Sequence, residues 1–177
     1  MIDFDKCQIT HYPAEVLAKP AKPVEKIDDE IRRLVEKMTE IMQEKKGVGF
    51  AAPQAGVPLR LFIISLDGSK EKVRVYINPT VTPIAEKGSS SFQENEEGCL
   101  SVPGIYTKIR RYKKCTVTAT DLSGNIFNEE ADGLYARALQ HEYDHIEGTT
   151  IVDRMLTTAK IVHRRQLNKL REKHDGR

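Results

Sequence analysis

The sequence has little net charge, few cysteines and no long apolar run. Its 177 residues carry 28 basic and 26 acidic side chains, a formal net charge of +2, which alone gives no argument for nucleic-acid binding. Three cysteines are too few for a disulfide framework in a chain this long, and they favour a reducing compartment. The first ten residues contain no apolar secretory segment, and no apolar run is long enough to cross a bilayer. We expect a cytoplasmic protein without a membrane partner.

Length and composition predict one globular domain over residues 1–177. Hydrophobic residues make up 39% of the chain and charged residues 31%, which is ordinary for a soluble protein. A chain of this length can bury one sizeable core. No internal repeat or linker divides the sequence.

Hydrophobic periodicity predicts an α+β fold. Apolar residues recur every three or four positions over 27–45, which is typical of an amphipathic helix. Two further helices are expected over 132–147, capped by Asp132 and ended by Gly148, and over 159–173. Strands are predicted at 59–66, 73–77, 114–121 and 126–130, and a polar loop at 79–93. Segregated strands and helices are typical of the α+β class.

The strongest chemical signal is a pair of histidines four residues apart. His141 and His145 share one face of the predicted helix, so both imidazoles can reach one metal ion. Glu142 follows the first histidine, where a carboxylate can exchange protons with a water on that ion. A surface helix with two unrelated histidines is the alternative interpretation.

A catalytic metal usually has three protein ligands and one open position, so a third ligand is needed. Cys99 is the upstream candidate, because a thiolate suits a soft or borderline metal and Gly98 beside it lets the backbone approach closely. Taken alone, Cys99 is better explained as a small buried apolar residue, but beside an incomplete two-histidine site the ligand role is favoured.

The segment from Gly47 to Gln54 is rich in small residues. Gly47 and Gly49 allow the chain to pass close to a ligand or to another strand. Gln54 adds an uncharged amide donor that can serve an oxyanion. A helix end followed by tight packing explains the same segment.

Together, three segments in this order resemble the peptide deformylase family. They are Gly47–Gln54, Glu97–Ser101 and Gln140–His145. The resemblance implies a compact domain in which antiparallel or mixed strands surround a central metal-binding helix, with further helices near both ends. It also implies one divalent metal ion, ferrous in the cell but replaceable by zinc, nickel or cobalt, with Cys99, His141 and His145 as its ligands.

The reaction implied by this resemblance is removal of the formyl group from N-formylmethionine on nascent peptides. Glu142 is the expected proton carrier, and the Gln54 amide and the backbone N–H of Leu100 are the expected donors to the oxyanion. Four residues are expected to bind the substrate. Leu134 and Ala138 share the helix face of the histidines, while Val48 and the adjoining Gly49 come from the glycine-rich segment.

Two details concern the surroundings of the site. Asp144 is expected to orient the helix through an ion pair with Arg110 or Arg111. Gly104-Ile105-Tyr106 stands where some family members place an arginine that touches substrate, so the details of peptide binding stay open.

Two other functions remain at this point: a zinc endopeptidase, which needs a third ligand other than Cys99, and a non-catalytic module with a structural metal, which needs four protein ligands.

The C-terminal segment from about residue 159 is unusually basic. Residues 158–177 contain seven basic and two acidic side chains, a net charge of +5 that leaves −3 on the rest of the chain. Such a helix can be attracted to the phosphate-rich surface of the ribosome, although a solvated surface helix is the more ordinary explanation of the charge. A buried stripe is expected to leave the basic side chains exposed; it comprises Leu156, Ile161, Val162, Leu167 and Leu170.

Overall fold

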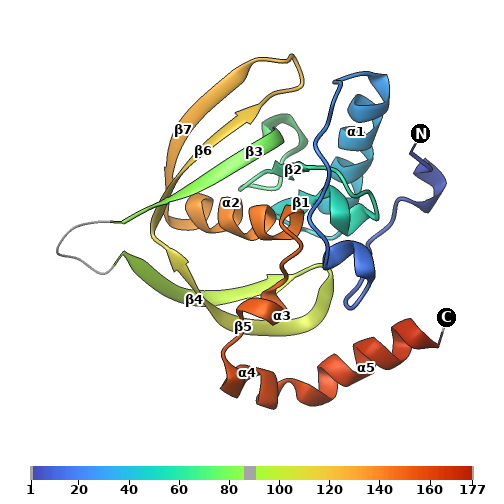
Figure 1. The fold of residues 1–177 in the computed structure, drawn as a ribbon, viewed down its shortest axis with the longest axis vertical. Coiled ribbons are helices and arrows are strands. Elements are labelled where there is room, and N and C mark those ends of the chain that lie inside the picture. The colour runs from blue at the N-terminus through green and yellow to red at the C-terminus, as the bar shows by residue number, and fades with distance from the viewer. Residues whose placement is uncertain (1, 86–90, 177) are drawn as a thin grey trace.

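The computed structural model describes residues 2–85 and 91–176. Residues 86–90 of the expected loop and Arg177 of the basic segment lie outside this range. Over these residues the chain forms a five-stranded sheet, a separate two-stranded sheet and five α-helices, with helix α2 between the two sheets (Figure 1). This arrangement confirms the α+β class.

The larger sheet is antiparallel throughout and has the order β1-β2-β3-β6-β7. Its strands are Gly49–Ala51 (β1), Leu61–Ile64 (β2), Arg74–Ile84 (β3), Lys114–Thr120 (β6) and Ile126–Asp132 (β7). Phe92–Cys99 (β4) and Val102–Tyr112 (β5) form the second sheet. The α-helices are Asp29–Glu44 (α1), Gly133–Ile146 (α2), Ile151–Arg154 (α3), Thr157–Val162 (α4) and Arg164–Asp175 (α5). Short 3₁₀ helices cover Phe4–Lys6 (η1), Glu15–Leu17 (η2), Ala52–Ala55 (η3) and Lys70–Lys72 (η4).

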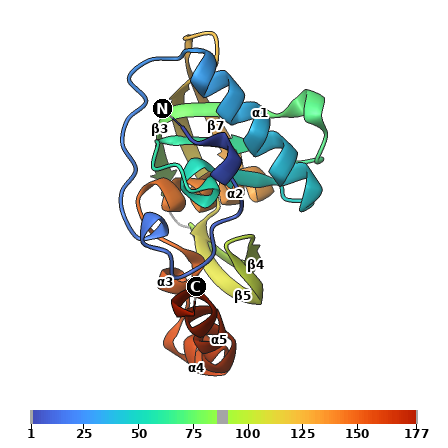
Figure 2. The ribbon, with the colours of Figure 1, turned by 90° about the vertical axis from the view of Figure 1, so that its right-hand side faces the viewer.

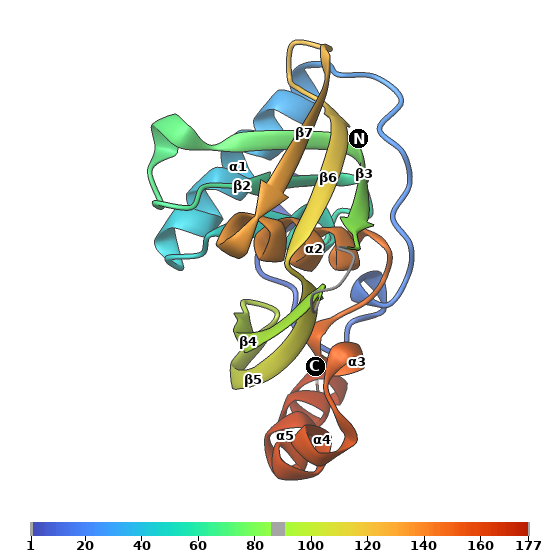
Figure 3. The same cartoon turned by 90° about the vertical axis from the view of Figure 1, so that its left-hand side faces the viewer.

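The β1–β2 end of the larger sheet is buried on both faces, whereas β6 and β7 turn one face toward solvent. Side chains alternate along a strand, so Leu61 and Ile63 of β2 pack in the cluster with α1, whereas Phe62 and Ile64 pack with α2. Figures 2 and 3 show α1 on one face of the sheet and α2 crossing the other. This packing fixes α2, the helix that carries both histidines, against a rigid surface.

The N-terminal arm crosses the molecule beside α2 and is tied to the sheet and to the turn after β4. Asn78, at a register shift in β3, accepts a hydrogen bond from the backbone N–H of Val24 and donates one to its carbonyl, both at 2.8 Å. Nearer the N-terminus, the backbone N–H of Thr10 donates to the carbonyl of Gln54, and that of Tyr12 donates to the carbonyl of Ser101, both at 2.8 Å. The arm therefore holds together two segments that the sequence places near the site.

Two sequence predictions about these elements were wrong. The expected loop over 79–93 is strand at both ends, because β3 continues to Ile84 and β4 begins at Phe92. Val81 is buried between the exposed Thr80 and Thr82, but the strand pattern is obscured by prolines, which are rare inside strands. The charged strand β4 was also missed, because its exposed face carries Glu94 and Glu96, a residue type depleted in strands.

The C-terminal helix is also different from its prediction. The chain breaks at His163 into α4 and α5, so the helical phase does not continue from Leu156 to Leu170. Leu167 is buried against β5 and α3, and Leu170 packs beside it. The other members of the expected stripe are exposed: Leu156 (61%), Ile161 (65%) and Val162 (75%).

Candidate metal centre and active site

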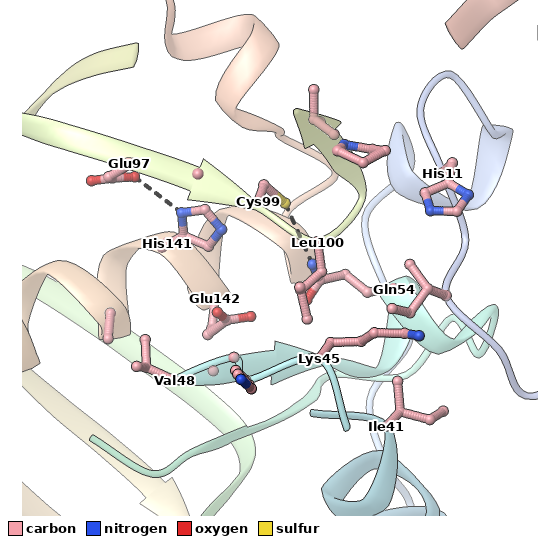
Figure 4. Close-up of a pocket in the computed structure, with 18 of the residues that line it drawn as sticks. His11, Ile41, Lys45, Val48, Gln54, Glu97, Cys99, Leu100, His141 and Glu142 are labelled. Atoms are coloured by element: carbon pink, nitrogen blue, oxygen red, sulfur yellow. Dashed lines mark hydrogen bonds and ion pairs between the residues drawn. The ribbon is translucent and has the colours of Figure 1, made fainter. Parts of the chain in front are cut away.

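The two histidines and Cys99 meet at one point. His141 and His145 lie one turn apart on α2, with ring centroids 5.0 Å apart. Cys99 reaches them from the end of β4, where the hairpin register shifts, and its Sγ lies 3.3 Å from Nε2 of His145. One potential ligand atom from each of the three residues lies within 4.8 Å of the others. Figure 4 shows Cys99 and His141 close together on one side of the pocket, with Glu142 below them.

The donor set fits a divalent transition metal. One thiol and two imidazoles are the ligands that zinc and related ions take in proteins. Burial and the positive charges nearby lower the pKa of His145 well below its ordinary value, so this ring is neutral and can offer a lone pair. Burial also opposes the cation of His141, but its hydrogen bonds with Cys99 and Glu97 outweigh this and raise its pKa, so metal and proton compete for this ring.

Glu142 lies beside this cluster and is buried, with 4% of its surface exposed. Its Oε2 has no hydrogen-bond partner within the described residues. Burial raises the pKa of the carboxyl to about 7, although the charge of His141 opposes the shift. A buried carboxyl with a free oxygen and such a pKa can accept and return a proton near neutral pH.

Gln54 is held by its own amide oxygen. Oε1 accepts a hydrogen bond from the backbone N–H of Ala51 at 2.8 Å, which orients the amide nitrogen toward the cluster. Nε2 lies 3.3 Å from Oγ of Ser101 and 3.5 Å from Sγ of Cys99. The structure therefore brings the expected amide donor to the cysteine.

A cleft of about 960 Å³ opens over the cluster. Its walls include every residue that the sequence nominated for substrate or oxyanion contact: Val48, Gly49, Gln54, Leu100, Leu134 and Ala138. Cys99, His141 and Glu142 also line it, whereas His145 lies beneath the surface with 1% exposure. The nominated residues thus surround one space.

A buried ionic network supports His141 from behind. Glu97 accepts a hydrogen bond from Nδ1 of His141 at 3.0 Å, drawn as a dashed line in Figure 4. Arg111 binds both oxygens of Glu97 at 3.0 Å, and Arg137 binds Oε1. Burial opposes the Glu97 anion, but the bonds from His141 and Arg111 outweigh it and lower its pKa to about 2.

The expected ion pair of Asp144 is confirmed with Arg111, whose Nη1 lies 2.5 Å from Oδ2. Arg110, the other candidate, instead places its guanidinium 4.0 Å from the ring centroid of Phe92. Arg154 of α3 also binds Asp144, at 2.5 Å, and was not expected. The pairs link α2, β5 and α3.

The sequence matches a family of known proteins over most of its length. The model of the family described as polypeptide deformylase matches residues 6–160. The chain belongs to this family. A peptide deformylase of Chromohalobacter salexigens is 38% identical over 169 residues, 96% of this chain and 95% of the relative. Peptide deformylase 1 of Clostridium perfringens is 46% identical over 143 residues, 80% of this chain and 92% of the relative.

Solved deformylase structures share the fold. A peptide deformylase from Legionella pneumophila superposes with a TM-score of 0.83 at 40% identity, covering 96% of this chain and 98% of that one. The plant enzyme PDF1B gives a TM-score of 0.91 at 31% identity, with 99% and 94% covered. Deformylases are metal-dependent hydrolases, so the alternative of a zinc endopeptidase is not favoured. None of the helices over residues 2–85 and 91–176 has the length and apolarity needed to span a membrane.

Glu97 and Arg137 were not predicted to belong to the site, although each is spaced from a candidate ligand so that the two share a face. Glu97 lies two residues before Cys99 on β4, and alternate residues of a strand share a face. Arg137 lies four residues before His141 on α2, and residues four apart share a helix face. Charged residues suggested exposure, whereas both side chains are buried because they pair with each other.

Proposed function

We propose that this protein hydrolyses the formyl group of N-formylmethionyl peptides at the start of nascent chains and releases formate. Membership of the deformylase family supports the reaction. The convergence of Cys99, His141 and His145 supports one metal ion per chain, held by these side chains. We further propose ferrous iron as the metal in the cell, on the ground of the family resemblance. A mixed thiolate and imidazole set also accepts zinc, nickel or cobalt.

In this proposal the residues of the cleft divide the chemistry among them. A bound divalent ion supplies Lewis acidity to water and to the formyl oxygen. Glu142 takes a proton from the attacking water and returns it to the departing amine. The water oxygen bonds to the formyl carbon and the carbon–nitrogen bond breaks, which yields formate and a peptide with a free N-terminal methionine. Nε2 of Gln54 and the backbone N–H of Leu100 donate hydrogen bonds to the oxyanion.

The methionine side chain is proposed to enter the apolar part of the cleft. Leu134 and Ala138 supply one wall from α2, and Val48 faces the same space from the segment before β1. Gly49 has no side chain, so the peptide backbone can pass close to β1. An unbranched thioether adapts well to a slot of this kind.

The observation that carries this proposal is the free, buried oxygen of Glu142 beside three convergent ligand atoms. The test is to measure metal content and the release of formate from formyl-Met-Ala, with acetyl-Met-Ala and an internal peptide bond as controls. Formate release that depends on the metal is expected. Cleavage of the internal bond without formate would instead indicate an endopeptidase.

We also propose a cytoplasmic location and transient contact with the ribosome through α4 and α5. The three cysteines are unpaired, and a metal-binding thiol must stay reduced. The basic side chains of this segment are exposed: Lys160, Arg164, Arg165, Lys169, Arg171 and Lys173. Their charge would raise the rate of encounter with an RNA surface rather than change the chemistry.

A further inference from the structure

We propose that Arg137 is a positioning residue that acts on the metal ligand His141 through Glu97. The proposal rests on the role of His141 as a ligand given above. Arg137 is on α2, one turn before His141, and its side chain is 7% exposed. Burial of a guanidinium costs free energy unless it is hydrogen-bonded, and the partners of Arg137 offset that cost.

The guanidinium joins the three elements that build the metal centre. Nη1 donates to Oε1 of Glu97 at 2.5 Å and to the carbonyl of Ile109 on β5 at 3.1 Å. Nη2 donates to the carbonyl of Gln93 on β4 at 3.4 Å. Arg137 thus ties α2, which carries both histidines, to both strands of the hairpin that carries Cys99.

The contacts of the two carboxylate oxygens show why Glu97 needs a second arginine to hold it in place. Oε1 accepts from Nε of Arg111 and from Arg137, whereas Oε2 accepts from Nη2 of Arg111 and from Nδ1 of His141. Arg111 is shared with Asp144, so its positive charge is divided between two buried carboxylates. Arg137 supplies a second full positive charge at Oε1 and so holds Oε2 directed at His141.

The hydrogen bond from His141 to Glu97 sets the orientation of the His141 ring. While Nδ1 is bound to Glu97, Nε2 is the nitrogen left for the metal. Loss of the Arg137 guanidinium leaves Oε1 with a single donor and lets the carboxylate turn, so the imidazole is no longer fixed in one orientation. Arg137 does not touch the reacting atoms in this account; it acts only through Glu97.

The test compares Arg137→Met, which keeps much of the side-chain volume, with Arg137→Lys, which keeps the charge. Release of Co²⁺ to a chelator should be roughly 10- to 100-fold faster in R137M, the usual size of an outer-shell effect, and kcat for formyl-Met-Ala should fall with little change in KM. R137K should recover part of both losses. The Nδ1 proton of His141, observed by NMR in the metal-free protein, should be retained in the wild type and exchange with solvent in R137M.

Leu134→Ala is the matched control, because Leu134 lines the same cleft from the same helix but has no bond to Glu97. It should raise KM and leave Co²⁺ release unchanged. A double variant with Glu97→Gln supplies the decisive comparison: in the E97Q background, R137M should add little to the release rate. An equal effect of R137M in both backgrounds would overturn the proposal, as would an effect on KM alone. If R137M does not fold, the same cycle with R137K decides the question.

The outcome also separates this inference from the proposed function. A wild-type protein that binds no Co²⁺ would reject the metal centre itself. A wild-type protein that binds Co²⁺, and an R137M variant that releases it at the same rate, would reject only the role of Arg137.

Discussion

Gly49 leaves free the space that the side chain of Glu142 occupies. A Cβ atom at residue 49 would lie 2.8 Å from Cδ and 2.9 Å from Cγ of Glu142, closer than real Cβ contacts come. Both residues are buried, so the carboxylate has little room to retreat. At the meeting point of the short strand β1 and helix α2, any residue larger than glycine would therefore force the Glu142 side chain to move.

Gly49→Ala should displace the Glu142 carboxylate while leaving the metal ligands in place. We expect normal metal content and a loss of turnover approaching the 100- to 10,000-fold that general acid–base catalysis contributes. Steady-state kinetics and elemental analysis measure both. In the double variant G49A/E142A the steric conflict is gone, so stability should recover while activity stays low. Wild-type turnover in G49A would show that Glu142 need not occupy this position.

Cys99→Ser, His141→Ala and His145→Ala should each lose both metal and activity. Each substitution removes one ligand of a set of three, and the affinity of such a site depends on the complete set. Elemental analysis of protein purified without oxygen is the measurement. Cys115→Ala is the control, because Cys115 is a buried free thiol whose Sγ donates to the carbonyl of Ala136. Full metal occupancy in C99S would remove Cys99 from the ligand set.

Glu142→Gln should keep the metal, lose most turnover and change the pH dependence of stability. Burial raises the pKa of this carboxyl from an ordinary 4.5 to about 7 in the metal-free protein. Between these values the folded state binds more protons than the unfolded state, so this group's contribution to stability is lost as pH rises toward 7. Glutamine does not titrate and escapes this loss.

Urea unfolding of metal-free wild type and E142Q at pH 5 and pH 8 tests the sign. The variant should gain on the wild type by up to about 3 kcal/mol as pH rises, since each unit of pKa shift corresponds to about 1.4 kcal/mol. A stability difference that is the same at both pH values would mean that the carboxyl has an ordinary pKa.

Gln54→Ala should lower kcat by roughly 100- to 1,000-fold if its amide donates to the oxyanion. The same amide nitrogen lies 3.3 Å from Oγ of Ser101, so Ser101→Ala serves as the comparison. It removes a neighbour of the amide but not the donor, and a smaller effect is expected. A change in KM alone for Q54A would limit the residue to substrate binding.

Charge reversal on α5 should weaken ribosome association without harming the chemistry. Truncation is unsuitable, because Leu167 of this helix is buried against β5 and α3. Arg165, Lys169 and Lys173 are exposed, so replacing them by glutamate should preserve the fold. Co-sedimentation with ribosomes should fall and should weaken steeply with salt in the wild type, while activity on formyl-Met-Ala stays unchanged. Equal ribosome binding by both proteins would leave α5 as a solvated helix.

The chemistry of this protein was easier to predict from sequence than its strands. His141 and His145 are four residues apart on one helix, a local relationship that helix geometry converts directly into proximity. Cys99 could be nominated only from the chemistry of the ligand set and from family resemblance, because its approach depends on the β4–β5 hairpin. That hairpin escaped prediction since β4 is rich in glutamate and one face of it is solvated.

The break at His163 was missed for a different reason. Residues 159–173 have a helical pattern on both sides of the break, and the docking of Leu167 against β5 and α3, which local sequence does not reveal, helps to fix the direction of the second helix. Similarly, Glu97 and Arg137 look like surface charges until the partner of each is known. Such tertiary pairings are not encoded in local periodicity.

The separation of Cys99 and His145 along the chain, 46 residues, makes metal uptake a measure of completed folding. An isolated peptide with the sequence of α2 would retain both imidazoles but would have no thiol near them. The β4–β5 hairpin alone would have the thiol of Cys99 but neither imidazole. High metal affinity would then belong to the native state only. During refolding, competition for the metal with a chelator of nanomolar affinity would report when the β4–β5 hairpin and α2 come together. Bound metal would stabilise the native state by an amount that grows with the logarithm of its free concentration.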